Sequence, residues 1–298
     1  MQIETEPSAS PVRDAASVVM LRDGASGLEV FLLKRHGLSD VLGGVYVFPG
    51  GKVDLEDANL DMPSRLDLPA RELHAALNEP GLDEQAAAVL YVAALRELFE
   101  EAGVLCAQGI DAARAGLASQ LLREGRAFDE VLAMMALRLE ASRLQPWSRW
   151  ITPVVGGVMR KRFDTRFFLA TVPAGQSARH DDHEATDSLW LAPREALRQY
   201  WDGAIELAPP QIMSLAHLAR HGSAASALAQ ARSRPPPAIR PESFEEAGGR
   251  TICYPGDERH SARERGLPGP TRLHHRNGRF EPAGGFDGFF LDAPPLSG

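Results

Sequence analysis

Cysteine is scarce in this chain, and long apolar runs are missing. Only Cys106 and Cys253 occur among 298 residues. Their separation fits neither a metal-ligand motif nor a disulfide framework, so both are expected to be small, semi-buried side chains. No segment approaches the roughly 18 uncharged apolar residues that span a bilayer, and the acidic residues 1–6 do not resemble a secretory signal peptide. These absences predict a cytoplasmic protein with no membrane partner.

Positive charge is also limited. The chain has 32 lysine and arginine residues against 40 aspartate and glutamate residues, which gives a formal net charge of −8. Proteins that bind nucleic acids usually show the opposite balance, so no nucleic-acid partner is expected. Apolar residues make up 44% and charged residues 24% of the chain, close to the average for globular proteins. The length suits one large domain or two ordinary ones.

Short apolar segments rich in β-branched residues predict strands at 16–21 and 28–34, joined by a turn, and a third strand at 45–48. Asp83 can cap a helix over 84–102, and Gly103 suits the left-handed position that ends it. Tyr91, Leu95 and Leu98 recur at helical spacing and predict a buried stripe. Further helices are expected at 71–77, 111–123, 128–141, 193–201 and 209–221, and further strands at 150–158, 166–172 and 188–192.

The C-terminal quarter has a different composition. An alanine-rich segment at 224–234 precedes three prolines at 235–237, which mark a candidate linker. Beyond them we expect strands at 250–254 and 271–281, and Asn277-Gly278 predicts a type I′ hairpin. Because this segment is short and rich in glycine, we expect it to pack on the main domain. The predicted division is a flexible leader at 1–14, a main domain at 15–222 and a C-terminal extension at 223–298.

Three carboxylates lie on one face of the helix predicted over 84–102. Glu97, Glu100 and Glu101 stand at i, i+3 and i+4. Like charges at this spacing repel unless water separates them or a divalent cation neutralises them, and hard oxygen ligands suit Mg²⁺ or Mn²⁺. A solvated acidic helix end is the simpler alternative, but negative charge near a helix C-terminus opposes the helix dipole. Arg96 is placed four residues before Glu100 and can hold that carboxylate.

This segment resembles the Nudix hydrolase family. The second half of the family motif, Arg-Glu-apolar-any-Glu-Glu-any-Gly-apolar, matches at every fixed position over 96–104, and the segment 48–54 is similar to the usual start of the motif. Asp57, or the adjacent Glu56, stands where the family has a glutamate. Between Asp57 and Arg96 lie 38 residues, where the family has seven. We expect a surface insertion at about 58–82, and this interrupted motif is similar to that of the coenzyme A diphosphatase-like branch.

The resemblance implies an α+β fold: a Nudix-type α/β/α sandwich with a mixed β-sheet, extra helices and a small β-rich C-terminal extension. It implies Mg²⁺- or Mn²⁺-dependent hydrolysis of a pyrophosphate bond in a nucleoside diphosphate linked to another moiety, with coenzyme A or an acyl-CoA among the candidates. The partner would be a small nucleotide-containing substrate, and a homodimer is open because Nudix proteins often dimerise. The alternative is a nucleotide sensor or interaction module, although such a protein has no need of three repelling carboxylates.

The resemblance also implies a set of site residues. Glu97, Glu100 and Glu101 would bind the metal together with the carbonyl of Gly50, with Glu101 as the principal ligand and Arg96 beside them. Glu184 is the candidate general base. It lies in a polar segment at 179–184, for which a charged surface loop and a separate metal site at His180 and His183 are the alternatives.

Basic residues gather at 160–166, and Arg162 and Arg166 are the candidates for binding substrate phosphates. Solvated surface is the alternative for both. Phe48, which precedes the Pro-Gly-Gly loop, is a further substrate-binding candidate. Phe163, Phe167 and Phe168 could stack on an adenine, but alternate residues of a strand more often face the core.

Overall fold

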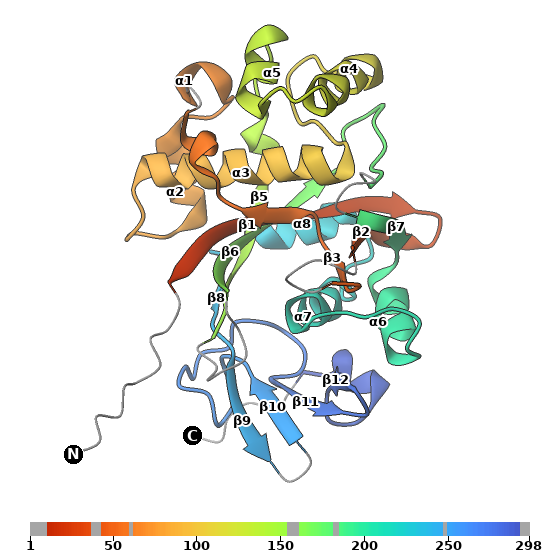
Figure 1. Cartoon of the computed structure of the whole chain (residues 1–298). Helices are drawn as coiled ribbons and strands as arrows, with labels where there is room; N and C mark the ends of the chain where they lie inside the picture. The colour runs from red at the N-terminus through yellow and green to blue at the C-terminus, as the bar shows by residue number, and fades with distance from the viewer. Residues whose placement is uncertain are drawn as a thin grey trace, which may run out of the picture.

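A mixed β-sheet with helices on both sides forms the centre of the molecule (Figure 1). The computed structural model describes residues 11–36, 43–59, 62–153, 161–180, 185–246 and 249–292. The strand order is β3-β2-β1-β6-β5-β8, with β4 paired to β1 and β7 to β2. β1 runs parallel to β6 and antiparallel to β2. The strands are β1 (Val12–Gly24), β2 (Gly27–Arg35), β3 (Tyr46–Val47), β4 (Gly50–Lys52), β5 (Gln145–Ile151), β6 (Arg162–Thr171), β7 (Ala185–Leu191) and β8 (Ala238–Ile239).

The helices form two layers, one on each side of this sheet (Figure 1). One layer contains α1 (Met62–Arg65), α2 (Ala70–Leu77), α3 (Glu84–Ala102), α4 (Ala112–Arg123) and α5 (Phe128–Met134), and the other contains α6 (Pro193–Trp201), α7 (Pro209–Leu218) and α8 (Ala224–Arg232). Single turns of 3-10 helix occur at η1 (Leu55–Asn59), η2 (Ala141–Arg143) and η3 (Phe286–Phe289). Within the described ranges, no helix combines the length and apolar character needed to cross a bilayer.

The alternation of side chains along β1 separates two hydrophobic clusters. Val18 and Met20 belong to the cluster on the α3 side, whereas Val19 and Leu21 belong to the cluster on the α6–α8 side. Successive residues of a strand point to opposite faces, so an unbroken apolar run implies a strand buried on both faces. This arrangement confirms the predicted mixed sheet between helical layers.

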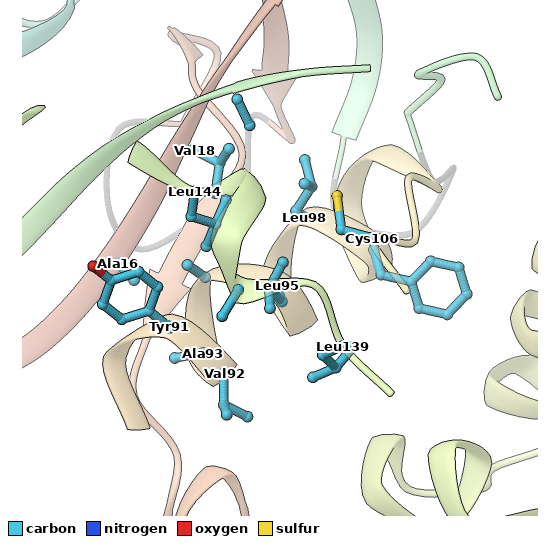
Figure 2. Packing of buried hydrophobic residues seen from close by; sticks show 14 of the residues in the cluster. Ala16, Val18, Tyr91, Val92, Ala93, Leu95, Leu98, Cys106, Leu139 and Leu144 are labelled. Carbon is cyan, nitrogen blue, oxygen red and sulfur yellow. The ribbon is translucent and has the colours of Figure 1, made fainter. Parts of the chain in front are cut away.

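Helix α3 has the predicted ends. The Asp83 side chain accepts a hydrogen bond from the Ala86 N–H at 2.7 Å, and Gly103 adopts φ 67° while its N–H bonds to the Phe99 carbonyl. The predicted stripe is buried, and Figure 2 shows Tyr91 and Leu95 packed with side chains of β1. Because the apolar stripe is fixed against the sheet, the orientation of the carboxylate face is fixed too.

The segment 62–82 contains the helix expected at 71–77 but is not confined to the surface as an insertion. This segment contains α1 and α2, and α2 packs on α3 (Figure 1). Leu66, Leu73 and Leu77 are buried in the cluster on the α3 side, and the Tyr91 hydroxyl donates to the Leu73 carbonyl. Leucines spaced by four residues bury one face of a short helix, so these extra residues extend the hydrophobic core.

Two predicted elements begin or end at other residues in the structure. α5 ends at Met134 instead of continuing to 141, because Ala136 adopts φ 49° and the Leu137 N–H bonds back to the Leu132 carbonyl. Leu139 then forms isolated β-bridges with Leu66 and Ala107. The strand expected at 150–158 begins earlier, since β5 covers Gln145–Ile151, and residues 154–160 lie outside the described ones.

The C-terminal segment forms a second, antiparallel sheet. Its order is β12-β11-β10-β9, from strands β9 (Glu242–Glu246), β10 (Gly249–Cys253), β11 (Arg272–Arg276) and β12 (Arg279–Glu281). Asn277 and Gly278 have positive φ, as a type I′ turn requires. The Tyr254 ring lies 6.0 Å from the Trp150 ring, and the Tyr200 hydroxyl accepts a hydrogen bond from the Phe280 N–H. Leu273 of β11 also belongs to the same hydrophobic cluster as Trp150 and Leu197, so the second sheet packs on the main domain.

A histidine is buried on α7, in the cluster on the α6–α8 side of the sheet. His217 is 0% exposed, its ring centroid lies 5.0 Å from that of Trp147, and its Nε2 lies 2.7 Å from the Gln230 Oε1. Burial, followed by the charge of Arg234, lowers the pKa of His217 to about 3. The side chain is therefore neutral in the folded protein at ordinary pH.

Candidate active site

The loop over Pro49 and Gly50 lies against β1. The Ser17 hydroxyl donates to the Pro49 carbonyl at 3.0 Å, and Gly50 has φ 152°. A Cβ on Gly50 would lie 2.4 Å from the Ala16 carbonyl oxygen, so no larger residue fits. At this position the Gly50 N–H donates a 2.7 Å hydrogen bond to Glu101 Oε2. The loop thus fixes one carboxylate of α3.

Gly51 leaves room for a second carboxylate. A Cβ at this position would lie 2.5 Å from Glu97 Oε1 and 2.7 Å from Glu97 Oε2. Glu97 and Glu101 are both buried, whereas the Glu100 side chain is 37% exposed. The two glycines therefore let the backbone of β4 approach α3 closely enough to enclose two of the three carboxylates.

Arg96 connects the two halves of the carboxylate site. Its Nε and Nη2 donate to the two oxygens of Asp57 at 2.7 and 3.0 Å, and its Nη1 donates to Glu97 and Glu100, each at 2.9 Å. Burial alone lowers the pKa of the guanidinium, but the hydrogen bond to Asp57 and the charges of Glu97, Asp57 and Glu100 raise it overall. Arg96 is therefore a permanent cation that orients two of the carboxylates.

The acid in the first half of the motif is Asp57. Its side chain is 1% exposed, and one of its oxygens also accepts the Asp54 N–H at 2.8 Å. Glu56, the alternative, is exposed. The shorter aspartate reaches Arg96 because η1 places it beside the middle of α3.

The carboxylates suit a hard divalent cation by their donor chemistry. Glu97, Glu100 and Glu101 supply oxygen atoms from one helical face, and the glycines enclose two of them. Among the described residues, no three acidic, histidine or cysteine side chains already surround a common metal position. Coordination by all three glutamates would therefore require some side-chain rotation, for which the half-exposed Glu100 has the most room.

Two clefts meet at the carboxylate face. The larger has a volume of about 870 Å³ and is bounded by α3, α4 and the segment 175–180, with Glu97, Glu100 and Glu101 in its wall. The smaller has a volume of about 360 Å³ and is lined by Asp54, Asp57, Arg96 and the turn between α4 and α5. Glu100 borders both clefts. The larger one has the volume of an ordinary small-molecule site.

A model of the NUDT19 Nudix domain matches residues 8–218. The chain belongs to this Nudix family. Acyl-coenzyme A diphosphatase NUDT19 of Xenopus laevis is 27% identical over 232 residues, which are 66% of this chain and 61% of the relative. The human protein of the same name is 29% identical over 275 residues, which are 75% of this chain and 72% of the relative. The chain thus spans less than two thirds of the Xenopus protein. The family match confirms the prediction of a Nudix protein from the coenzyme A diphosphatase branch.

A solved structure agrees with this assignment. A Nudix hydrolase from Alicyclobacillus acidocaldarius superimposes with a TM-score of 0.59 and 26% sequence identity, covering 76% of this chain and 98% of that chain. Together with the two helical layers and the second sheet, this similarity confirms the predicted Nudix-type α+β fold with a β-rich extension.

The structure does not place Arg166 where a substrate phosphate could reach it. Its side chain is 4% exposed and is paired with Glu79 at 2.7 Å and with Asp14 and Asp164. Arg149 contacts the same Glu79 at 2.8 Å. This buried network links β6 and β5 to the segment after α2, so a structural role explains Arg166.

Phe48 and Arg162 also have positions apart from the cleft walls. Phe48 is 2% exposed and packs edge-on against Phe167, with ring centroids 6.2 Å apart. This contact places Phe48 in the cluster on the α6–α8 side, which explains it as a core residue. Arg162 donates to the Thr152 carbonyl at 3.2 Å, next to residues outside the described ones.

The candidate general base, Glu184, lies outside the described residues, as does His183. His180 does border the larger cleft, and its Nδ1 lies 2.9 Å from the Ser188 hydroxyl. The structure links Gly50 to Glu101 through its N–H, and coordination of a metal by the Gly50 carbonyl stays a prediction.

Arg123 and Arg179 were missed by sequence reasoning although both border the larger cleft. Arg123 is in the last turn of α4, and Arg179 is in the segment that leads to β7. An arginine near a helix end, such as Arg123, is common, and Arg179 was considered only as part of the polar segment 179–184, so neither was singled out. Only the folded chain brings them to the carboxylate face.

Proposed function

We propose that this chain hydrolyses the pyrophosphate bond of coenzyme A or an acyl-CoA. Water would add across the bridging P–O–P bond and release adenosine 3′,5′-bisphosphate and phosphopantetheine or its acyl derivative. The observation that carries the proposal is the set of Glu97, Glu100 and Glu101 in the wall of one cleft, two of them held by Arg96 and one by Gly50. The names of the Xenopus and human relatives support coenzyme A as the substrate class.

Each carboxylate has a distinct part in this proposal. Glu101, fixed by the Gly50 N–H, and Glu97, enclosed by Gly51, would hold the metal in a defined position. Glu100 is the most exposed of the three and would complete the ligand set from the side where both clefts meet. When bound, Mg²⁺ or Mn²⁺ would neutralise charge on the bridging phosphates and lower the pKa of the attacking water.

Arg96 and Glu184 would have two further roles beside the metal ligands. Arg96 is turned toward the carboxylates and Asp57, so it would position ligands and not touch substrate. Glu184 is proposed as the base that takes the proton of the attacking water. A pH–rate profile of Glu184→Gln tests that role, because loss of a general base changes the rate and the ascending limb. An unchanged profile would remove Glu184 from the mechanism.

A substrate panel tests the proposed reaction. The full chain is incubated with Mg²⁺ and, separately, with coenzyme A, an acyl-CoA, ADP-ribose, NADH and a diadenosine polyphosphate, and the products are separated by chromatography. We expect cleavage of coenzyme A or the acyl-CoA to adenosine 3′,5′-bisphosphate, and loss of that activity with a chelator. Cleavage of ADP-ribose but of neither CoA compound would contradict the substrate class. No product from any compound would favour a nucleotide sensor, and full activity with the chelator would contradict the metal assignment.

A further inference from the structure

Two arginines stand in the wall of the larger cleft together with the three carboxylates. Arg123 is in the last turn of α4, and Arg179 follows a segment tied to the end of α3. That tie consists of the Arg179 N–H donating to the Ala102 carbonyl at 3.0 Å and of the Gln176 amide making two hydrogen bonds to the Leu105 backbone. The backbone of Arg179 is therefore held directly beside the carboxylate end of α3.

The guanidinium groups of these two residues differ from those of the buried arginines. Within the described ranges, neither Arg123 nor Arg179 makes a side-chain hydrogen bond or ion pair, and both are exposed. Arg114, on the same helix as Arg123, donates to the Gly109 and Met135 carbonyls instead. Arg96 and Arg166 are both buried in ion-pair networks. Other exposed arginines, among them Arg126 and Arg232, also lack such a side-chain contact within the described ranges, so Arg123 and Arg179 are set apart by their place in the wall of the larger cleft.

The α4 side of this cleft is open. α4 presents four small residues to the cleft, at helical spacing: Ala112, Ala115, Gly116 and Ser119. A Cβ added at Gly116 would meet no atom within 4 Å. A small-residue stripe alone indicates nothing about a ligand, but here it borders the same cleft as two arginines and a metal-type carboxylate face. An extended anion can lie in that cleft with one charged group at the carboxylates and another at the arginines.

We propose that Arg123 and Arg179 bind a phosphate monoester of the substrate that is remote from the pyrophosphate under attack. In coenzyme A this group is the 3′-phosphate of the adenosine ribose. The proposal rests on the proposed function for the choice of coenzyme A. The pyrophosphate would be bound by the cation that the carboxylates hold. A phosphate monoester away from that cation needs hydrogen-bond donors from the protein, and a guanidinium group offers two parallel N–H donors. The two residues would therefore select coenzyme A over its analogue without the 3′-phosphate.

Steady-state kinetics with coenzyme A and dephospho-coenzyme A test this selection. We expect Arg123→Ala and Arg179→Ala each to raise KM for coenzyme A by about tenfold and to leave KM for dephospho-coenzyme A and kcat nearly unchanged. Arg123→Lys should recover part of the loss, because lysine binds phosphate as a point charge. Arg232→Ala, in the last turn of α8 on the other side of the sheet, removes the same charge far from the cleft and should change neither KM.

Other outcomes would overturn the proposal. Equal losses with both substrates would assign the arginines to the pyrophosphate, and unchanged kinetics in both variants would show that neither contributes to substrate binding. If Arg126→Ala but not Arg123→Ala loses the selectivity for coenzyme A over dephospho-coenzyme A, the phosphate-binding site lies in the smaller cleft, which Arg126 borders. Calorimetric binding of adenosine 3′,5′-bisphosphate against AMP repeats the test without turnover. Preference for the bisphosphate, lost in Arg123→Ala, would support the phosphate site even if coenzyme A were not cleaved.

Discussion

Asp57 and Arg96 form a two-point ion pair across 39 positions of the sequence, with donor–acceptor distances of 2.7 and 3.0 Å. The aspartate side chain is 1% exposed and that of the arginine 10%. A pair this buried holds η1 to the middle of α3 while the segment between them forms two helices. It preserves the carboxylate face despite the interruption of the Nudix motif.

Replacing Asp57 by asparagine should destabilise the protein by about 3 kcal/mol. Removal of one partner leaves a buried charge, and the effect stays near the lower end of the usual range because Glu97 and Glu100 still contact Arg96. Urea unfolding measures the loss. Asp54→Asn is the matched control, since Asp54 lies 3.6 Å from Arg96 with a 31% exposed side chain and should cost less than about 1 kcal/mol. Equal losses in the two variants would contradict a special role for Asp57.

Glu101→Gln should lower kcat for the proposed hydrolysis by at least about 100-fold, because a metal ligand contributes several kcal/mol to stabilising the transition state. The fold should persist, since the glutamine carbonyl can still accept the 2.7 Å hydrogen bond from the Gly50 N–H. Activity and thermal unfolding are measured on the same preparation. Glu84→Gln, in the exposed first turn of α3, should retain wild-type activity. Near-normal Mg²⁺-dependent turnover in Glu101→Gln would remove Glu101 from the metal site.

Gly51→Ala should affect the metal more than the fold. Its Cβ would displace only the end of the flexible Glu97 side chain, 2.5 Å away. We expect a loss of stability below about 1 kcal/mol and an apparent Mg²⁺ affinity lower by about tenfold, measured by titrating activity with the metal. Gly50→Ala is the contrasting variant. Its Cβ meets the Ala16 backbone at 2.4 Å and should cost about 2 to 4 kcal/mol. Unchanged Mg²⁺ dependence in Gly51→Ala would contradict the role of Glu97.

Much of this site could be predicted from local patterns. The spacing of Glu97, Glu100 and Glu101 places them on one helical face, and Asp83 and Gly103 mark the ends of that helix. Contacts between distant segments gave no such signal. The choice between Asp57 and Glu56 depends on which one η1 turns inward, and the sequence around them is acidic at both positions.

The predictions that the structure contradicts also depended on contacts between distant segments. Arg166 and Arg162 have similar sequence surroundings, yet only the packing of Glu79 against β6 shows that Arg166 is a buried structural cation. Leu139 continues a helical spacing but forms β-bridges, because Ala136 reverses the chain after α5. The helix predicted at 71–77 is present as α2, but its burial against α3 gave no local signal because it depends on contacts between distant segments.

The buried network around Arg166 predicts a stability effect without a substrate effect. Arg166→Met leaves Glu79, whose side chain is 10% exposed, with Arg149 as its remaining partner at 2.8 Å. We expect a loss of about 3 kcal/mol in the free energy of unfolding and an unchanged KM for coenzyme A. Chemical denaturation and steady-state kinetics check the two parts. A higher KM at unchanged stability would restore Arg166 to the substrate-binding residues.

His217 predicts how stability depends on pH. Its pKa is lowered to about 3 in the folded protein, against about 6.5 in the unfolded chain. Between these pH values the unfolded state binds one more proton than the folded state. The contribution of the neutral His217 ring to the free energy of unfolding is therefore complete above pH 6.5 and is lost as pH falls toward 3. In His217→Asn the slope of unfolding free energy against pH between 6 and 4 should decrease by up to about 1.4 kcal/mol per pH unit, measured by urea unfolding at several pH values. A wild-type slope in His217→Asn would show that the buried ring does not control acid stability.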